Sequence, residues 1–120
     1  MYIANDKTLF QLKQEFNRKF PLLTLEFYAR PHGKDEVSFK ADELDDELTV
    51  SEARRNTSGL TGEISLRGNR KVSRLEEELL KKYGLSVQVF FRSGTCRYQT
   101  TLSDNSTLSQ LQQRGKQTSQ

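Results

Sequence analysis

The feature that most constrains this chain is a pattern of apolar residues that occurs twice, at an offset of 63 residues. In each copy, a short alternating segment precedes a stretch in which apolar residues recur every three or four positions, as on one face of a helix. The helical stretches contain Leu9, Leu12, Phe16 and Phe20 in the first copy and Val72, Leu75, Leu79 and Tyr83 in the second. The pattern therefore predicts a duplicated strand-then-helix plan.

The repeat continues beyond the helix with small changes of offset. One residue fewer in the connection "GL" than in "PLL" changes the offset to 62, which aligns the alternating segments that begin at Leu23 and Leu85. An offset of 58 then aligns "SFKADELDDELTVSEARR" with "CRYQTTLSDNSTLSQLQQ", and "RPHGKD" and "RSGT" are turn signals before these segments. The predicted order is β-α-β-β-α twice, over residues 1–58 and 62–115, with a disordered tail at 116–120.

Four S/T-x-x-E/Q capping boxes predict the starts of four helices, at Thr8, Thr49, Ser73 and Thr107. Each half has too few apolar residues to close a core alone. We therefore expect one α+β domain in which the helices pack on one face of a mixed sheet. The first six elements, β-α-β-β-α-β, also have a ferredoxin-like order.

Composition narrows the class of protein. The 120 residues have a mean hydropathy of -0.78 and contain no long apolar run, so neither a membrane span nor a secretion signal is expected. Cys96 is the only cysteine, which excludes an intrachain disulfide and favours a cytoplasmic location. Residues 1–60 carry a net charge of -2 and residues 61–120 one of +5, so the second half should attract polyanions.

The second half resembles a known signature. "KVSRLEEELLKKYGLSVQVFFRSG" followed by "TTLSDNSTLSQLQ" is similar to the C-terminal part of a family of short uncharacterised bacterial proteins. The resemblance covers about half of the chain and implies no activity, because none is established for that family. The family pattern often has tryptophans where this chain has Arg97 and Ser106, so any binding role of those tryptophans would be lost here.

Residues that could carry catalysis are few. His32 is the only histidine, and a nucleophilic pair with Cys96 would require hydrogen-bond contact, whereas the predicted hairpin tips of the two copies lie apart. The acidic segment 41–53 lacks the glycine and the spacing of a calcium loop and is better explained as a solvated helix start. We therefore predict no catalytic residue, metal, cofactor or small-molecule substrate, and expect that the protein is not an enzyme.

Strand alternation predicts a sheet face that the helices leave open. If Leu25 and Val89 face the helices, each copy places an aromatic ring and an arginine on the other side. The residues expected there are Tyr28, Arg30, Phe90, Arg92 and, from the neighbouring strand, Arg97. Such a face suits a protein partner or a second copy of the chain, or a single-stranded nucleic acid, unless the rings merely shield each other.

A second candidate surface is basic. Arg67, Arg70, Lys71 and Arg74 cluster around the start of the third predicted helix, where they could hold phosphate groups. The alternative is an ordinary solvated helix supported by the pairs Glu77–Lys81 and Glu78–Lys82. The sequence thus predicts a non-enzymatic binding module, acting through the open sheet face on a protein partner or in a homodimer, with nucleic-acid binding as the alternative.

Overall fold

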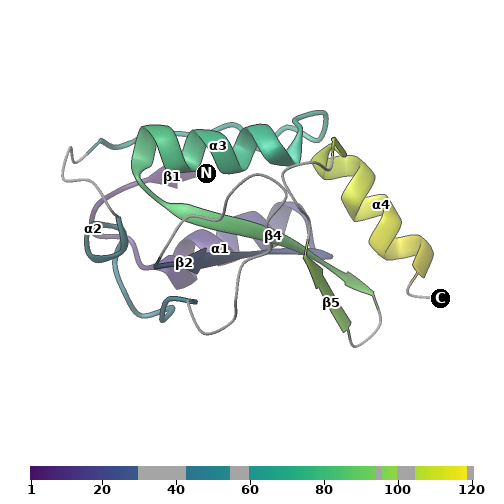
Figure 1. Ribbon diagram of the computed structural model, residues 1–120, viewed down its shortest axis with the longest axis horizontal. Helices are drawn as coiled ribbons and strands as arrows, with labels where there is room; N and C mark the ends of the chain where they lie inside the picture. The colour runs from purple at the N-terminus through teal and green to yellow at the C-terminus, as the bar shows by residue number, and fades with distance from the viewer. Residues whose placement is uncertain (30–42, 55–59, 94–95, 100–104, 119–120) are drawn as a thin grey trace.

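The computed structural model describes residues 1–29, 43–54, 60–93, 96–99 and 105–118. These residues form an α+β structure (Figure 1). The elements run in the order β1 (Tyr2–Ile3), α1 (Leu9–Lys19), β2 (Leu23–Tyr28), α2 (Val50–Ala53), β3 (Gly62–Glu63), α3 (Val72–Tyr83), β4 (Ser86–Ser93), β5 (Cys96–Gln99) and α4 (Leu108–Thr118). The second half therefore has the predicted order β-α-β-β-α, and in the first half the predicted strand before α2 lies largely outside the described residues.

The described strands form two antiparallel sheets, so the expectation of a mixed sheet is wrong for this part of the chain. The first sheet pairs β1 with β3, and the second has the order β2-β4-β5. In the second sheet Leu23 lies opposite Phe91 and Tyr28 lies opposite Ser86, so β2 and β4 run antiparallel. The pair Ser93–Cys96 leaves two residues for the turn between β4 and β5, which confirms the predicted hairpin.

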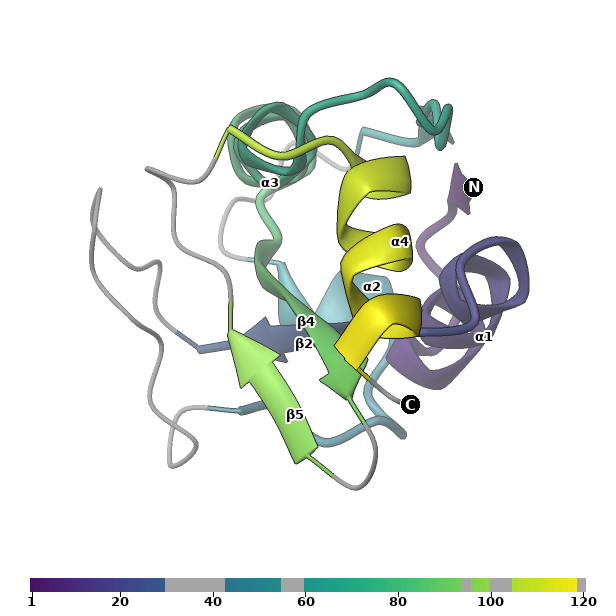
Figure 2. The same ribbon diagram turned by 90° about the vertical axis from the view of Figure 1, so that its right-hand side faces the viewer.

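The three longer helices pack on the three-stranded sheet (Figure 2). α1 contacts β2, α3 contacts β4, and α4 contacts both strands. The apolar stripes of both copies are buried as predicted, from Leu9 to Phe20 and from Val72 to Tyr83. Together with the strand residues around Leu25 and Val89 they belong to one hydrophobic cluster drawn from both halves of the chain.

Three of the four predicted capping boxes are present. At α1, the Thr8 amide donates to Gln11 Oε1 at 2.9 Å, and the Gln11 amide donates to Thr8 Oγ1 at 3.2 Å. The boxes at Thr49 and Thr107 have the same reciprocal bonds. The box predicted at Ser73 is wrong, because α3 already begins at Val72 and the N-cap is Lys71, whose side chain makes no capping bond.

The residue expected to complete the Ser73 box has another role. Glu76 is buried, and its Oε2 accepts a hydrogen bond from the Val89 amide of β4 at 2.9 Å. A second correction concerns the C-terminus, where α4 continues through Gly115 to Thr118. The disordered tail predicted for residues 116–120 is therefore wrong for 116–118, and 119–120 lie outside the described residues.

Backbone contacts of the two halves agree under the offsets that align their sequences. The isolated bridge between Thr8 and Thr49 has its counterpart between Lys71 and Thr107. The Val50 amide donates to the Lys7 carbonyl at 2.8 Å, and the Leu108 amide donates to the Arg70 carbonyl at 2.9 Å. The residues just before α1 are thus bonded to the start of α2 in the same way as the residues just before α3 are bonded to the start of α4.

Side chains agree in the same manner. Lys7 Nζ donates to the Tyr2 carbonyl at 2.9 Å and pairs with Glu15 at 2.8 Å. At the offset of 63, Arg70 donates to the Ser65 carbonyl at 3.2 Å and pairs with Glu78. The central pair of the sheet, Glu26 with Gln88, also consists of residues that the offset of 62 makes equivalent.

Candidate functional site: an unpaired basic surface on α3

The aromatic residues predicted for an open sheet face are not exposed. Tyr28 is 1% exposed and Phe90 is 5% exposed. The strand register does place both on the side of the sheet opposite Leu25 and Val89, so the predicted side is right and the predicted exposure is wrong. Alternation determines which side of a strand a residue occupies, but it does not determine whether that side is covered.

The arginines of this face are less completely described. Arg30 lies outside the described residues. Arg92 of β4 lies directly opposite Arg97 of β5 in the strand register, as the hairpin predicted, and their side chains are outside the described part. A role of these residues in partner binding stays a prediction.

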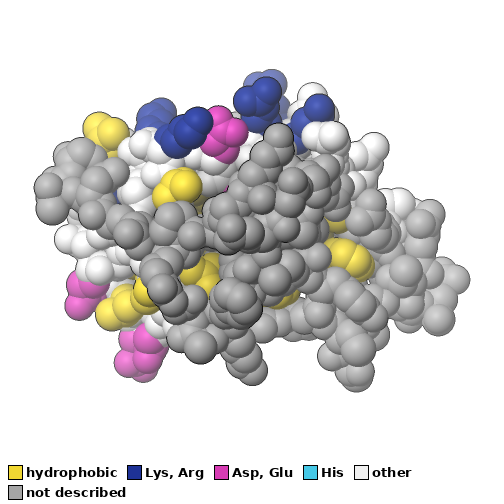
Figure 3. Space-filling view, viewed as in Figure 1, with side chains coloured by type: hydrophobic (Ala, Val, Ile, Leu, Met, Phe, Trp, Pro, Cys, Tyr) yellow, Lys and Arg dark blue, Asp and Glu magenta, His cyan; other side chains and the backbone are white. Residues whose placement is uncertain are grey.

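The basic candidate is exposed. Arg67, Lys71 and Arg74 are solvent-exposed, as is Lys82 near the end of α3, and none of the four forms an ion pair with a described residue. We refer to these four residues as the α3 basic surface. Figure 3 shows dark-blue side chains gathered along the upper edge of the molecule, over α3.

Each glutamate of α3 has its hydrogen bond or ion pair with a residue outside this surface, although the charge of Arg74 also acts on Glu77. Glu76 accepts from the Val89 amide, Glu77 pairs with Lys81 at 3.0 Å, and Glu78 pairs with Arg70. The pair with Lys81 lowers the pKa of Glu77, with a smaller contribution from Arg74, so Glu77 stays ionised at neutral pH. The predicted pair Glu77–Lys81 is confirmed, and the predicted pair Glu78–Lys82 is wrong because Glu78 binds Arg70 instead.

Arg70 therefore belongs to the framework and not to the binding surface. It is half-buried and is held by Glu78 and by the Ser65 carbonyl. Lys82, which the sequence argument left out, takes its place: its Nζ lies 5.4 Å from the centre of the Tyr83 ring. Helical spacing could have identified Lys82, because positions 71, 74, 78 and 82 share one face of a helix.

The helix geometry gives the length of the surface. At about 1.5 Å of rise per residue, Lys71 and Lys82 are separated by roughly 16 Å along α3. Arg74 lies between them, and Arg67 precedes the helix. The cations thus form a row whose length is comparable to a few consecutive phosphates of a nucleic-acid strand.

The position of Lys71 and Arg74 is electrostatically unfavourable for the isolated protein. Lys71 is the N-cap of α3 and Arg74 lies in its first turn, where the helix dipole presents its positive end and where cations are destabilising. The equivalent residues of α1 are Thr8 and Gln11, which form a capping box. The second half therefore has two repelling cations where the first half has a stabilising cap.

Other charged groups have structural roles. Lys13 bridges α1 to Glu26 of β2 at 2.7 Å and to Asp46 of the acidic segment. Burial alone would lower the pKa of Lys13, but the hydrogen bonds and charges of Asp46 and Glu26 outweigh it and raise the pKa above 10.5. In the described residues of the acidic segment, Asp46 thus serves to hold α1 in place.

The described part of the structure does not test the two residues considered for catalysis. His32 lies outside the described residues, and Cys96 begins β5 with its side chain outside the described part. Within the described ranges, no three His, Cys, Asp or Glu side chains come close enough to hold a metal ion. No helix in the same ranges is both long and apolar enough to cross a membrane.

Comparison with protein-family models, curated proteins and solved structures found no match to this chain.

Proposed function

We propose that this protein is a non-enzymatic nucleic-acid-binding module that holds the phosphate backbone against the α3 basic surface. The observation that carries the proposal is the row of four exposed cations that have no ion-pair partner among the described residues, although all three glutamates of the same helix have partners. Phosphates would supply the missing counter-charge.

The comparison of the two helix starts supports this choice. We infer that the chain arose by internal duplication, because the hydrogen bonds and ion pairs of Lys7 and Arg70 coincide under the sequence offset. On such a frame, Thr8 and Gln11 show that a capped helix start is compatible with the fold. A capped start should therefore also fit α3, and an anionic partner would explain why Lys71 and Arg74 occupy these unfavourable positions.

Nucleic acid replaces a protein partner as the leading candidate because of the burial of Tyr28 and Phe90. The protein-partner or homodimer hypothesis depended on exposed rings as interface hot spots. Binding through phosphates alone predicts no base preference and a dissociation constant in the range of about 10⁻⁴ to 10⁻⁶ M at physiological salt. The single cysteine supports a cytoplasmic site of action.

The experiment relocates two charges without changing the net charge of +3. In the exchange variant T8K/Q11R/K71T/R74Q, the cations move from α3 to the equivalent positions of α1. Fluorescence anisotropy with a labelled oligonucleotide should show about a 15-fold weaker affinity at about 0.15 M salt, because two phosphate contacts are lost. The slope of log K against log[salt] should become shallower by about 1.5.

Two outcomes would contradict the proposal. If the exchange variant binds as tightly as the wild type, net charge and not the α3 basic surface controls binding. If the wild type binds an acidic polypeptide such as polyglutamate more tightly than an oligonucleotide of equal charge, the partner is an acidic protein. Sedimentation of the free protein tests the homodimer hypothesis in the same samples.

A further inference from the structure

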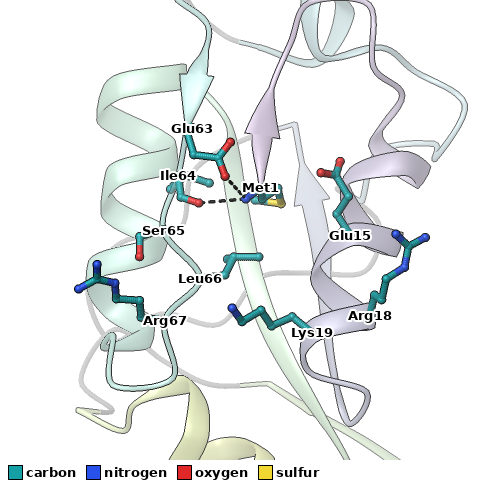
Figure 4. A pocket seen from close by; sticks show the side chains of 9 residues that line it. All are labelled: Met1, Glu15, Arg18, Lys19, Glu63, Ile64, Ser65, Leu66 and Arg67. Atoms are coloured by element: carbon teal, nitrogen blue, oxygen red, sulfur yellow. Dashed lines mark hydrogen bonds and ion pairs between the residues drawn. The ribbon is translucent and has the colours of Figure 1, made fainter.

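A groove lies beside the α3 basic surface, between the end of α1 and the segment that follows β3. It has a volume of about 580 Å³, and its walls include Arg18 and Lys19 on one side and Ser65 to Arg67 on the other (Figure 4). Arg67 belongs both to this groove and to the α3 basic surface. The groove is therefore a continuation of that surface around the start of α3.

The groove carries positive charge that no described residue neutralises. It also contains two acidic side chains, but Glu63 pairs with the Met1 ammonium group at 3.0 Å and Glu15 pairs with Lys7 at 2.8 Å. Arg18, Lys19 and Arg67 have no ion pair with a described residue. An anion entering the groove would thus meet cations and no unpaired carboxylate.

The directions of the side chains separate two of these cations. Lys19 extends across the groove toward Leu66, whereas Arg18 points away from the groove on the outer side of α1 (Figure 4). Ile64 and Leu66 also line the groove near Lys19, but they are buried and offer a ligand little apolar surface. The ammonium group of Lys19 is therefore the main feature that a ligand would meet there, and it favours a phosphate.

A second hollow adjoins the first at Lys19. It has a volume of about 630 Å³ and lies between the α1–β2 connection and α4. Its two walls are joined by a hydrogen bond, because the Leu22 amide donates to Gln112 Oε1 at 2.9 Å. Lys19 lines both hollows, and we refer to the two hollows together as the trough.

We propose that this trough selects single-stranded nucleic acid: a strand bound on the α3 basic surface continues past Arg67 into the trough, where Lys19 contacts one backbone phosphate. Each hollow is within the range of about 300–1,000 Å³ typical of small-ligand sites, which leaves room for part of one strand. We expect a duplex, whose strands stay paired and stiff, to bind the α3 basic surface and to miss Lys19. This inference depends on the proposed function and adds to it a preference for single strands.

The test compares K19Q with the conservative variant K19R, which keeps a cation at the position where Lys19 extends across the groove. Affinities for a single-stranded oligonucleotide and for a duplex of equal length are measured over a range of salt concentrations. K19Q should bind the single strand about fourfold more weakly at about 0.15 M salt, with a slope shallower by about 0.7. Its affinity for the duplex should equal that of the wild type, and K19R should restore single-strand binding to near the wild-type affinity.

The outcomes distinguish the two proposals. If K19Q binds single strands like the wild type while K71T/R74Q is weakened, the trough is not part of the path, and the basic surface on α3 remains. If K19Q loses affinity for single strand and duplex equally, the preference for single strands is wrong. If neither K19Q nor K71T/R74Q changes binding, both proposals are overturned.

Discussion

Restoring a capping box at the start of α3 should stabilise the protein while it weakens ligand binding. The substitutions K71T and R74Q give α3 the residues that α1 has at Thr8 and Gln11. The backbone is already suitable: Lys71 has φ -71° and ψ 138°, close to the φ -82° and ψ 159° of Thr8. The new threonine side chain can therefore accept from the amide of residue 74, which in the wild type donates to the Lys71 carbonyl at 3.1 Å.

The expected gain follows from two contributions. A capping residue in place of a side chain that makes no cap bond contributes about 1 kcal/mol to the free energy of unfolding. Removing two cations from the positive end of an exposed helix contributes about 0.3 kcal/mol or more for each. With an unfolding entropy of about 2.1 cal/mol/K per residue, a total of about 1.6 kcal/mol raises the Tm of this 120-residue chain by about 6 °C.

Urea titration and differential scanning calorimetry measure this change, with T8K/Q11R as the matched control. The control removes the box of α1 and adds two cations there, so it should lose a similar amount of stability. The reasoning would be refuted if K71T/R74Q were no more stable than the wild type, because Lys71 and Arg74 would then not be a cost to the isolated fold.

Two further predictions concern the framework. A Cβ at Gly62 would lie 2.9 Å from the hydroxyl of buried Tyr83, so G62A should lower the free energy of unfolding by about 1–3 kcal/mol. In a Y83F background the same substitution should cost less, because the contact with the hydroxyl is removed while the unfavourable φ of 159° at Gly62 remains; an equal cost in both backgrounds would show that this contact is not the cause. Because the folded-state pKa of Lys13 lies above 10.5, its stabilising effect is present below that pH and is lost as the pH rises through the folded value. The difference in urea midpoint between wild type and K13M should therefore shrink at high pH; a constant difference would contradict the assigned role of Lys13.

Periodicity predicted the apolar framework well. The stripes of α1 and α3 and the inward residues of β2 and β4 are buried because helix and strand periods determine which residues share a face. The hairpin predicted from the turn signal at Arg92 to Thr95 is also confirmed. This prediction succeeded because a short turn brings its two flanking strands side by side, whatever the rest of the chain does.

The predictions that were wrong concern features that depend on contacts between distant parts of the chain. Ser73 and Glu76 match a capping box, but α3 already begins at Val72, the first residue of its buried apolar stripe. Glu76 is buried against β4 instead. Tyr28 and Phe90 have the predicted side but not the predicted exposure. The sequence suggested Arg70 as a binding residue because it is one of several neighbouring cations. Its bonds to Glu78 and to the Ser65 carbonyl, which the sequence does not show, identify it as structural.

The most direct measurement is an amide chemical-shift titration of the ¹⁵N-labelled protein with a single-stranded oligonucleotide. The account predicts that shifts concentrate at Arg67 to Arg74 and at Lys82, and that they are strongly reduced in K71T/R74Q at equal oligonucleotide concentration. Shifts confined to the strands around Tyr28 and Phe90, with α3 unchanged, would contradict it.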